Sequence, residues 1–205
     1  MSSKDWTTSA STTIFTGFGG SFAALVFASE YSRTPAIATE DPMILRDDTF
    51  SPRKITAASS SQICDGSSAA LIVSEAMLKE HGLTPLARIV DLTVTAGDPV
   101  IMLEEPLFAT DKALKKAGLS IDDIDLYEVN EAFSVVSLAV NEIAELPADR
   151  VNVNGGSVAL GHPIGASGAR ILITLLFAMQ AREAQRGVAS LCIGGGEAVA
   201  VLVER

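Results

Sequence analysis

Residues 152–170 read NVNGGSVALGHPIGASGAR and carry the clearest structural pattern in the chain. The segment places His162, one of two histidines, between a short apolar strand and a long apolar helix that begins near residue 166. Its glycines allow the backbone to turn tightly and to approach a ligand, and Pro163 fixes the backbone directly after the histidine. The pattern therefore predicts a strand, a turn and a helix that together hold the imidazole in place.

Strands and helices alternate around this unit. From residue 87 the predicted order is β-α-β-α-β-α-β-β, with strands at 87–95, 124–129, 151–153, 188–192 and 198–203 and helices at 107–117, 131–145 and 166–182. Such alternation favours an α/β fold with a mostly parallel five-stranded sheet, covered by helices and closed by an antiparallel hairpin. A further helix is expected over 69–81, because apolar residues recur there at helical spacing before Gly82.

The first 53 residues differ from the rest of the chain. They are rich in serine and threonine, contain three prolines and show no sustained periodicity, so we interpret 1–53 as a poorly specified N-terminal arm. No charged residue occurs between Trp6 and Ser29, which raises the alternatives of a signal peptide or a membrane span. Glycines and hydroxyl residues dilute that run and Lys4 is offset by Asp5, so the arm is favoured.

The composition limits the classes of partner. Of 205 residues, 48% are hydrophobic and 20% are charged, which indicates a heavily buried sheet or a face meant for a partner. The formal net charge of −10 opposes binding to nucleic acid or to an anionic membrane. Cys64 and Cys192 lie too far apart for a disulfide framework or a metal-ligand pattern, so a reducing cytoplasm is expected.

Three side chains capable of catalysis follow predicted strands. Asn130, His162 and Cys192 supply an amide, an imidazole and a thiol, and the carboxyl ends of parallel strands meet at one sheet edge. An imidazole serves as acid or base near neutral pH, and a thiolate is a nucleophile and a base. Backbone N–H groups of the glycines from Gly194 onward are suited to a developing oxyanion. The set predicts acyl or enolate chemistry rather than metal catalysis, since no further histidine or cysteine is available for coordination.

Each residue also has a purely structural interpretation. A single histidine in a turn before a helix is often a hydrogen-bonded packing residue, and a cysteine in an apolar strand is usually an inert small hydrophobe. The combination in glycine-rich surroundings favours a functional site.

Three blocks give the chain a family resemblance. Residues 130–133 (NEAF), 161–168 (GHPIGASG) and 192–196 (CIGGG) resemble the signature blocks of the carboxy-terminal half of thiolases, the acetyl-CoA C-acyltransferases. The resemblance runs from about residue 55 to residue 205 and does not include 1–53. It implies that 54–86 is a remnant of the CoA-binding loop region and that 87–205 is the thiolase C-terminal domain.

The resemblance also implies roles for single residues. His162, with a water held by Asn130, would stabilise the enolate oxygen of a thioester and help to activate the nucleophile. Cys192 would be the acid and base at the acyl α-carbon, and the Gly194 N–H would contribute to a second oxyanion site. Ser61 falls where thiolases have a serine beside the pantetheine of CoA, although neighbouring positions of that block depart from its commonest form, namely Ala58, Ser59, Gln62 and Cys64.

The main departure concerns the nucleophile. Thiolases carry a nucleophilic cysteine in an amino-terminal half of the same fold, and 1–53 contains no cysteine, while Cys64 is interpreted as a loop thiol. The resemblance thus implies an acyltransferase acting on acyl-CoA or 3-oxoacyl-CoA thioesters, by Claisen condensation or thiolytic cleavage, that is incomplete alone. No permanently bound cofactor is expected, and CoA thioesters are the substrates. The expected protein partners are further copies of the chain or a chain that carries the missing half.

Two alternatives remain open. One is a non-catalytic protein, either a CoA-binding or subunit-assembly module or a truncated, vestigial thiolase. The other is a ketoacyl synthase, which shares the two-half architecture but typically has two histidines or a histidine and an asparagine in place of the cysteine at Cys192. The Cys-x-Gly-Gly-Gly ending favours thiolase.

Overall fold

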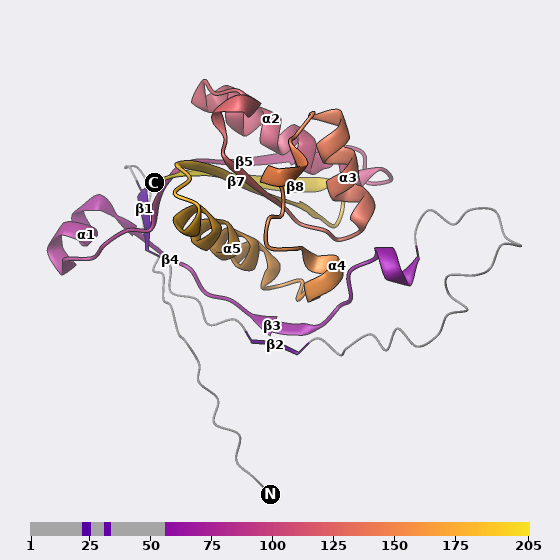
Figure 1. Ribbon diagram of the computed structural model, residues 1–205, viewed down its shortest axis with the longest axis horizontal. Helices are drawn as coiled ribbons and strands as arrows, with labels where there is room; N and C mark the ends of the chain where they lie inside the picture. The colour runs from indigo at the N-terminus through magenta and orange to yellow at the C-terminus, as the bar shows by residue number, and fades with distance from the viewer. Residues whose placement is uncertain (1–21, 26–30, 34–55) are drawn as a thin grey trace, which may run out of the picture.

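A central sheet lies between two layers of helices (Figure 1). The computed structural model describes residues 22–25, 31–33 and 56–205. Its six-stranded sheet has the order β4-β1-β5-β8-β7-β6. The strands are β1 (Phe22–Leu25), β4 (Leu71–Ser74), β5 (Ala87–Ala96), β6 (Leu126–Val129), β7 (Arg186–Ile193) and β8 (Glu197–Glu204). A separate two-stranded sheet pairs β2 (Tyr31–Arg33) with β3 (Asp65–Ser67).

Helices pack on both faces of the large sheet. The α-helices are α1 (Glu75–His81), α2 (Glu105–Ala117), α3 (Ser134–Ile143), α4 (Ser157–Leu160) and α5 (Ser167–Ala181). Short 3-10 turns occupy Ala57–Ser59, Met102–Glu104, Ile121–Asp123 and Ala148–Arg150. In Figure 1, α2 and α3 cover one face of the sheet and α5 lies against the other. None of the helices in the described part of the chain is long and apolar enough to span a membrane.

The expected α/β class is confirmed, but the expected mostly parallel five-stranded sheet is wrong in its pairing. β5, β6 and β7 do run in the same direction. However, β8 returns from the glycine turn after β7 and inserts between β7 and β5, antiparallel to both. Only the β6–β7 pair is therefore parallel, and β1 joins β4 to β5 through antiparallel pairs. The N-terminal segment thus contributes β1 to this sheet and β2 to the smaller one, whereas most of 1–53 lies outside the described residues.

The helix expected over 69–81 is wrong in its first half. Leu71, Ile72 and Val73 form β4 and are all buried, and a short apolar run of this kind is ambiguous between strand and helix. The helix α1 begins only at Glu75, where the Ser74 side chain accepts a hydrogen bond from the Met77 N–H at 3.3 Å. It ends as expected at Gly82, which has φ +62°.

The strand expected at 151–153 is also wrong. Val151 makes one isolated parallel bridge with Tyr127, and Asn152 then turns into the left-handed region with φ +48°. The helices expected at 107–117 and 166–182 are confirmed as α2 and α5. The residues of α5 expected to face inward are all buried, namely Ile171, Leu172, Leu175, Leu176 and Met179.

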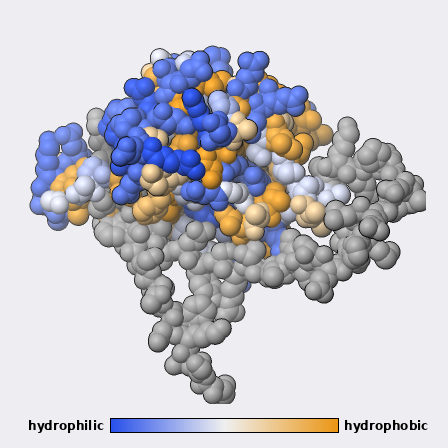
Figure 2. Space-filling view, in the orientation of Figure 1, coloured by the Kyte–Doolittle hydropathy of each residue, from blue (hydrophilic) through white to orange (hydrophobic). Residues whose placement is uncertain are grey.

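One apolar part of the sheet is left uncovered. Alternate residues of β8 separate two cores, so that Val203 packs with α5 and Leu202 with the α2–α3 layer. On the α5 side, Leu92, Val94 and Ile193 remain 62%, 53% and 43% exposed. We call these three residues the apolar sheet strip. Elsewhere, Figure 2 shows hydrophobic side chains interrupting a mostly hydrophilic surface.

Candidate active site

Asn130 lies directly after β6 and is 1% exposed. Its backbone N–H donates to Ser190 O on β7 at 2.9 Å. Its Oδ1 accepts a hydrogen bond from Ser157 Oγ at 2.7 Å, and Ser157 is fully buried at the start of α4. Its Nδ2 is buried and has no partner among the residues that the structure describes. A buried amide donor of this kind is suited to a ligand oxygen or a water.

Glu131, the next residue, anchors the segment that leads to His162. Its Oε2 accepts from the Val158 N–H at 3.2 Å and its Oε1 accepts from Asn152 Nδ2 at 3.3 Å. A Cβ placed on Gly156 would lie 2.2 Å from the Glu131 carboxylate, so this glycine leaves room for the contact. Glu131, Asn152 and Ser157 stand in or beside the motif blocks, but their roles as tethers were not predicted from the sequence.

His162 is half-buried in the turn between α4 and α5. Its backbone N–H donates to Gln62 O at 2.7 Å, and its Nδ1 lies 2.6 Å from Ser167 Oγ. The Ser167 hydroxyl donates to Pro163 O at 3.1 Å, so we assign it as the acceptor of an Nδ1–H proton. In this tautomer the lone pair is on Nε2. Burial, followed by the charge of Arg170, lowers the pKa of His162, which favours the neutral ring.

Ser61 connects the Asn130 and His162 loops. Its backbone N–H and its hydroxyl both donate to Ala132 O, at 3.1 and 2.7 Å. Two residues later, Ile63 forms a parallel bridge with His162. The segment 61–63 therefore lies between the loop after β6 and the loop before α5, so Ser61 lies next to the two loops that carry Asn130 and His162.

Cys192 and Gly194 lie at the neighbouring strand end. Asn130 bonds to Ser190, two residues before Cys192 on β7, and Gly194 is exposed in the turn to β8. Cys192 pairs in register with Ala198, whose side chain belongs to the α2–α3 core. No hydrogen bond joins the Cys192 thiol to Asn130 or His162 in the described part of the chain. Burial raises the pKa of this thiol, which favours the protonated form.

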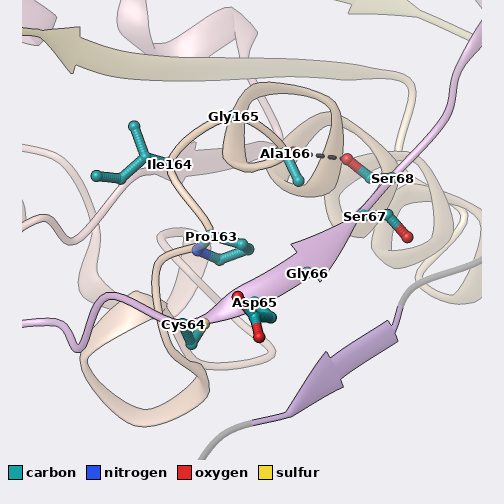
Figure 3. A pocket seen from close by; sticks show the side chains of 9 residues that line it. All are labelled: Cys64, Asp65, Gly66, Ser67, Ser68, Pro163, Ile164, Gly165 and Ala166. Carbon is teal, nitrogen blue, oxygen red and sulfur yellow. Dashed lines mark hydrogen bonds between the residues drawn. The ribbon is translucent and has the colours of Figure 1, made fainter.

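A groove of about 370 Å³ runs beside the His162 turn (Figure 3). Residues 64–68 line one side and residues 163–166 line the other. Ser68 Oγ crosses it by donating to Ala166 O at 2.6 Å. Cys64 is a half-buried free thiol at one end, as expected for a loop cysteine. Across the described ranges, no group of three or more His, Cys, Asp or Glu side chains is arranged to hold a metal ion.

A family model described as "Thiolase, C-terminal domain" matches residues 83–205 of this chain. The chain belongs to the thiolase family. Among similar proteins, the acetyl-CoA acetyltransferase of Thiocystis violacea is 45% identical over 181 residues, which cover 88% of this chain and 46% of that protein. The acetyl-CoA acetyltransferase of Escherichia coli strain K12 is 52% identical over 151 residues, or 74% of this chain and 38% of that protein.

Solved thiolase structures resemble the fold. The crystal structure of human mitochondrial 3-ketoacyl-CoA thiolase matches with a TM-score of 0.72 and 48% identity, over 73% of this chain and 38% of that chain. The acetyl-CoA acetyltransferase of Bacillus anthracis matches with a TM-score of 0.72 and 47% identity, over the same shares of the two chains.

All four of these relatives are longer than the matched region. The chain spans less than half the length of each of them. The alignment with the acetyl-CoA acetyltransferase of Thiocystis violacea covers 88% of this chain. The part of the chain left outside that alignment is therefore much shorter than 53 residues. The similarity to that protein therefore extends into 1–53, the segment in which the motif blocks gave no family resemblance.

Proposed function

We propose that this chain forms one wall of the active site of a thiolase-type acyltransferase that acts on acyl-CoA and 3-oxoacyl-CoA thioesters. The reaction is a Claisen condensation in one direction and a thiolytic cleavage in the other. The observation that best supports this proposal is the unpartnered Nδ2 of Asn130, buried beside the strand end that carries Cys192 in a chain of this family. A donor held in a site shielded from water stabilises developing negative charge well.

In the cleavage direction, a thiolate attacks the 3-oxo carbonyl carbon, and the bond between C2 and C3 breaks with its electron pair delocalised onto the thioester oxygen. In the assigned tautomer, His162 has its lone pair on Nε2, and this nitrogen can take the proton of the nucleophilic thiol. The resulting Nε2–H, with a water held by Asn130 Nδ2, then donates to the enolate oxygen. His162 thus acts first as a base and then as an oxyanion donor.

Cys192 donates its proton to C2 and becomes a thiolate, while the acyl group remains on the nucleophilic sulfur. The thiol of CoA then gives its proton to the Cys192 thiolate and attacks this acyl group, and the released nucleophilic thiolate takes back its proton from His162. Burial favours the protonated Cys192 thiol by raising its pKa, and this is the form required in the cleavage direction. Gly194 is exposed in the turn after β7, and its N–H supplies a donor for the second carbonyl oxygen in this proposal. We propose that Ser61 and the rest of 54–86 form part of the CoA site, and that 87–205 is the catalytic C-terminal domain.

In this proposal the nucleophilic cysteine comes from outside the described residues. A partner surface that packs against the exposed apolar sheet strip comes from outside them as well. The apolar sheet strip supports it, because exposed apolar patches mark interaction surfaces. We propose that the covering partner carries the first half of the thiolase fold or is a further copy of this chain. The same strip supports the second candidate function, a non-catalytic assembly module. Two free cysteines fit a reducing compartment, and we place the protein in the cytoplasm.

Two measurements test the proposal. Calorimetric titration with CoA measures binding, and cleavage of acetoacetyl-CoA is followed with and without a separately produced chain that carries the nucleophilic half. We expect turnover only with both chains. We expect Cys192→Ser to abolish this turnover, whereas Cys64→Ser should retain it because Cys64 carries no reacting group in this proposal. CoA binding and a stable two-chain complex without any turnover would favour the assembly module. Turnover by this chain alone that requires Cys64 would contradict the proposal.

A further inference from the structure

A chain of three buried side chains connects α5 to Asn130. Arg170 Nη2 donates to Ser157 Oγ at 2.6 Å, and Ser157 Oγ donates to Asn130 Oδ1 at 2.7 Å. The three residues are 3%, 0% and 1% exposed. They come from three separate elements, namely the first turn of α5, the start of α4 and the end of β6. The orientation of the Asn130 amide therefore depends on contacts that are distant in the sequence.

The chemistry of the three groups fixes the direction of both hydrogen bonds. A guanidinium group only donates, so Ser157 Oγ is the acceptor in its bond with Arg170. The single hydroxyl proton of Ser157 is then available for Asn130, which must present its carbonyl oxygen. An amide rotated by half a turn would leave the Ser157 proton without an acceptor in a buried site, which is costly. The free donor Nδ2 consequently points away from Ser157.

No ion pair with a carboxylate accounts for Arg170 within the described residues. Glu128 is the other buried ionisable group near it, and burial raises the pKa of Glu128 to about 8 despite the opposing charge of Arg170. The same guanidinium also lowers the pKa of His162. Burying a cation without a close carboxylate costs free energy. The side-chain hydrogen bond that the structure gives Arg170 in return is the one to Ser157 Oγ.

We propose that Ser157 and Arg170 are positioning residues, which hold the Asn130 amide with Nδ2 directed at the oxygen that it is to bind. This inference rests on the proposed function for its catalytic consequence, whereas the orientation of the amide is a property of the folded chain. Ser157 and Arg170 touch neither substrate nor reacting atoms in this scheme. They act through Asn130, because a donor in a polar site must be fixed before the reaction in order to stabilise charge.

The orientation is tested first by NMR on the full 205-residue chain labelled with ¹⁵N. The two Nδ2 protons of Asn130 are assigned from their loss in Asn130→Asp. We expect Ser157→Ala to shift both signals and to increase the mobility of the amide on the nanosecond timescale. Ser137→Ala is the matched control, because Ser137 is also buried but donates to Ser134 O within α3.

A second pair of variants tests Arg170 in case Ser157→Ala does not fold. Arg170→Lys keeps a charged donor and should retain most of the wild-type amide signals. Arg170→Met fills a similar volume without a donor and should produce the same shift as Ser157→Ala. Unchanged Asn130 amide signals in both Ser157→Ala and Arg170→Met would overturn the inference, whatever an assay shows.

The catalytic consequence is tested in the two-chain assay of acetoacetyl-CoA cleavage. We expect Ser157→Ala to lower kcat by about 10- to 100-fold while KM changes little, as for a misplaced catalytic group. In an Asn130→Ala background, Ser157→Ala should have no further effect on kcat. Equal effects in both backgrounds would show a merely structural role and overturn the inference. Absence of turnover in the wild-type pair would instead contradict the proposed function, and the NMR result would still decide the orientation.

Discussion

The side-chain amide of Asn152 forms both backbone hydrogen bonds of Val129. The Val129 N–H donates to Asn152 Oδ1 at 2.8 Å, and Asn152 Nδ2 donates to Val129 O at 2.9 Å. A neighbouring strand would normally supply these two hydrogen bonds through its backbone. Here the Asn152 side chain supplies them, because the backbone of Asn152 has already left the extended conformation with φ +48°. This contact lies directly before Asn130, so it anchors the strand end that carries the Asn130 amide, whose Nδ2 has no partner among the described residues.

We expect loss of the Asn152 amide to destabilise the fold. Asn152→Gly keeps access to positive φ but leaves the buried backbone groups of Val129 without partners, at a cost of about 2–4 kcal/mol in the free energy of unfolding. Asn152→Ala should cost about 1 kcal/mol more because of its left-handed backbone. Urea unfolding measures both changes.

Asn141→Ala is the control for that experiment. The buried Oδ1 of Asn141 has no partner within the described part of the chain, so its removal should change the free energy of unfolding little. If Asn152→Gly were as stable as the wild type, the amide would not be replacing a strand in solution.

Local sequence patterns predicted the elements whose structure depends mainly on their own residues. The proline near the start of α2, the glycine after it and the apolar stripe of α5 are such signals, and both helices are confirmed. The position of β8 between β5 and β7 was not predictable in this way, since it depends on which strand edges remain free. Asn152 likewise ended a predicted strand through a contact 23 residues away in sequence.

The site shows the same division. Asn130, His162 and Cys192 were identified because their residue types and glycine-rich surroundings are visible in the sequence. Ser157 and Arg170 were not, because a serine and an arginine in apolar or glycine-rich segments give no signal until folding brings them to Asn130. The segment 152–170 therefore contains His162, which is proposed to react, and also Ser157 and Arg170, which are proposed to hold Asn130 in place.

Glu128 should make stability depend on pH. Burial raises its pKa to about 8 from an ordinary value of 4.5. Below pH 4.5 the folded and unfolded states both keep the proton, and between pH 4.5 and about 8 only the folded state does. The free energy of unfolding should therefore fall as the pH rises through this window, and level off above it.

Glu128→Gln removes this titration and measures its size. Relative to the wild type, the variant should gain stability between about pH 5 and about pH 8, by an amount on the order of a few kcal/mol. Glu80→Gln, an exposed change on α1, serves as the control. Parallel pH profiles for the wild type and Glu128→Gln would show that the Glu128 carboxyl is not buried in solution.

His162 should titrate below its usual pKa of 6.5, because burial and the charge of Arg170 both disfavour the imidazolium. NMR titration of the ring measures this pKa, with His162→Asn for assignment. Arg170→Met removes one of the two causes and should move the midpoint upward, while Ser137→Ala should leave it unchanged. A midpoint at or above the usual value in the wild type would contradict the neutral, base-first state proposed for His162.

The glycine turn after Cys192 gives the last prediction, because two of its residues differ in what they tolerate. Gly196 has φ +90°, and a Cβ there would lie 2.8 Å from Gly97 O and 3.0 Å from Pro99 Cα, both of them backbone atoms. Gly97 N–H also donates to Gly196 O at 2.8 Å, so a shift of the turn would break the link between β5 and β8.

We therefore expect Gly196→Ala to lower the free energy of unfolding by about 2–4 kcal/mol, through strain at positive φ and the backbone clash. Gly194→Ala is the matched substitution, since a Cβ at that position meets open space and φ is not positive. It should leave stability unchanged within about 0.5 kcal/mol, as measured by urea unfolding. Equal losses for the two variants would mean that Gly194 is as crowded in solution as Gly196, which would contradict the open space that the structure shows beside it.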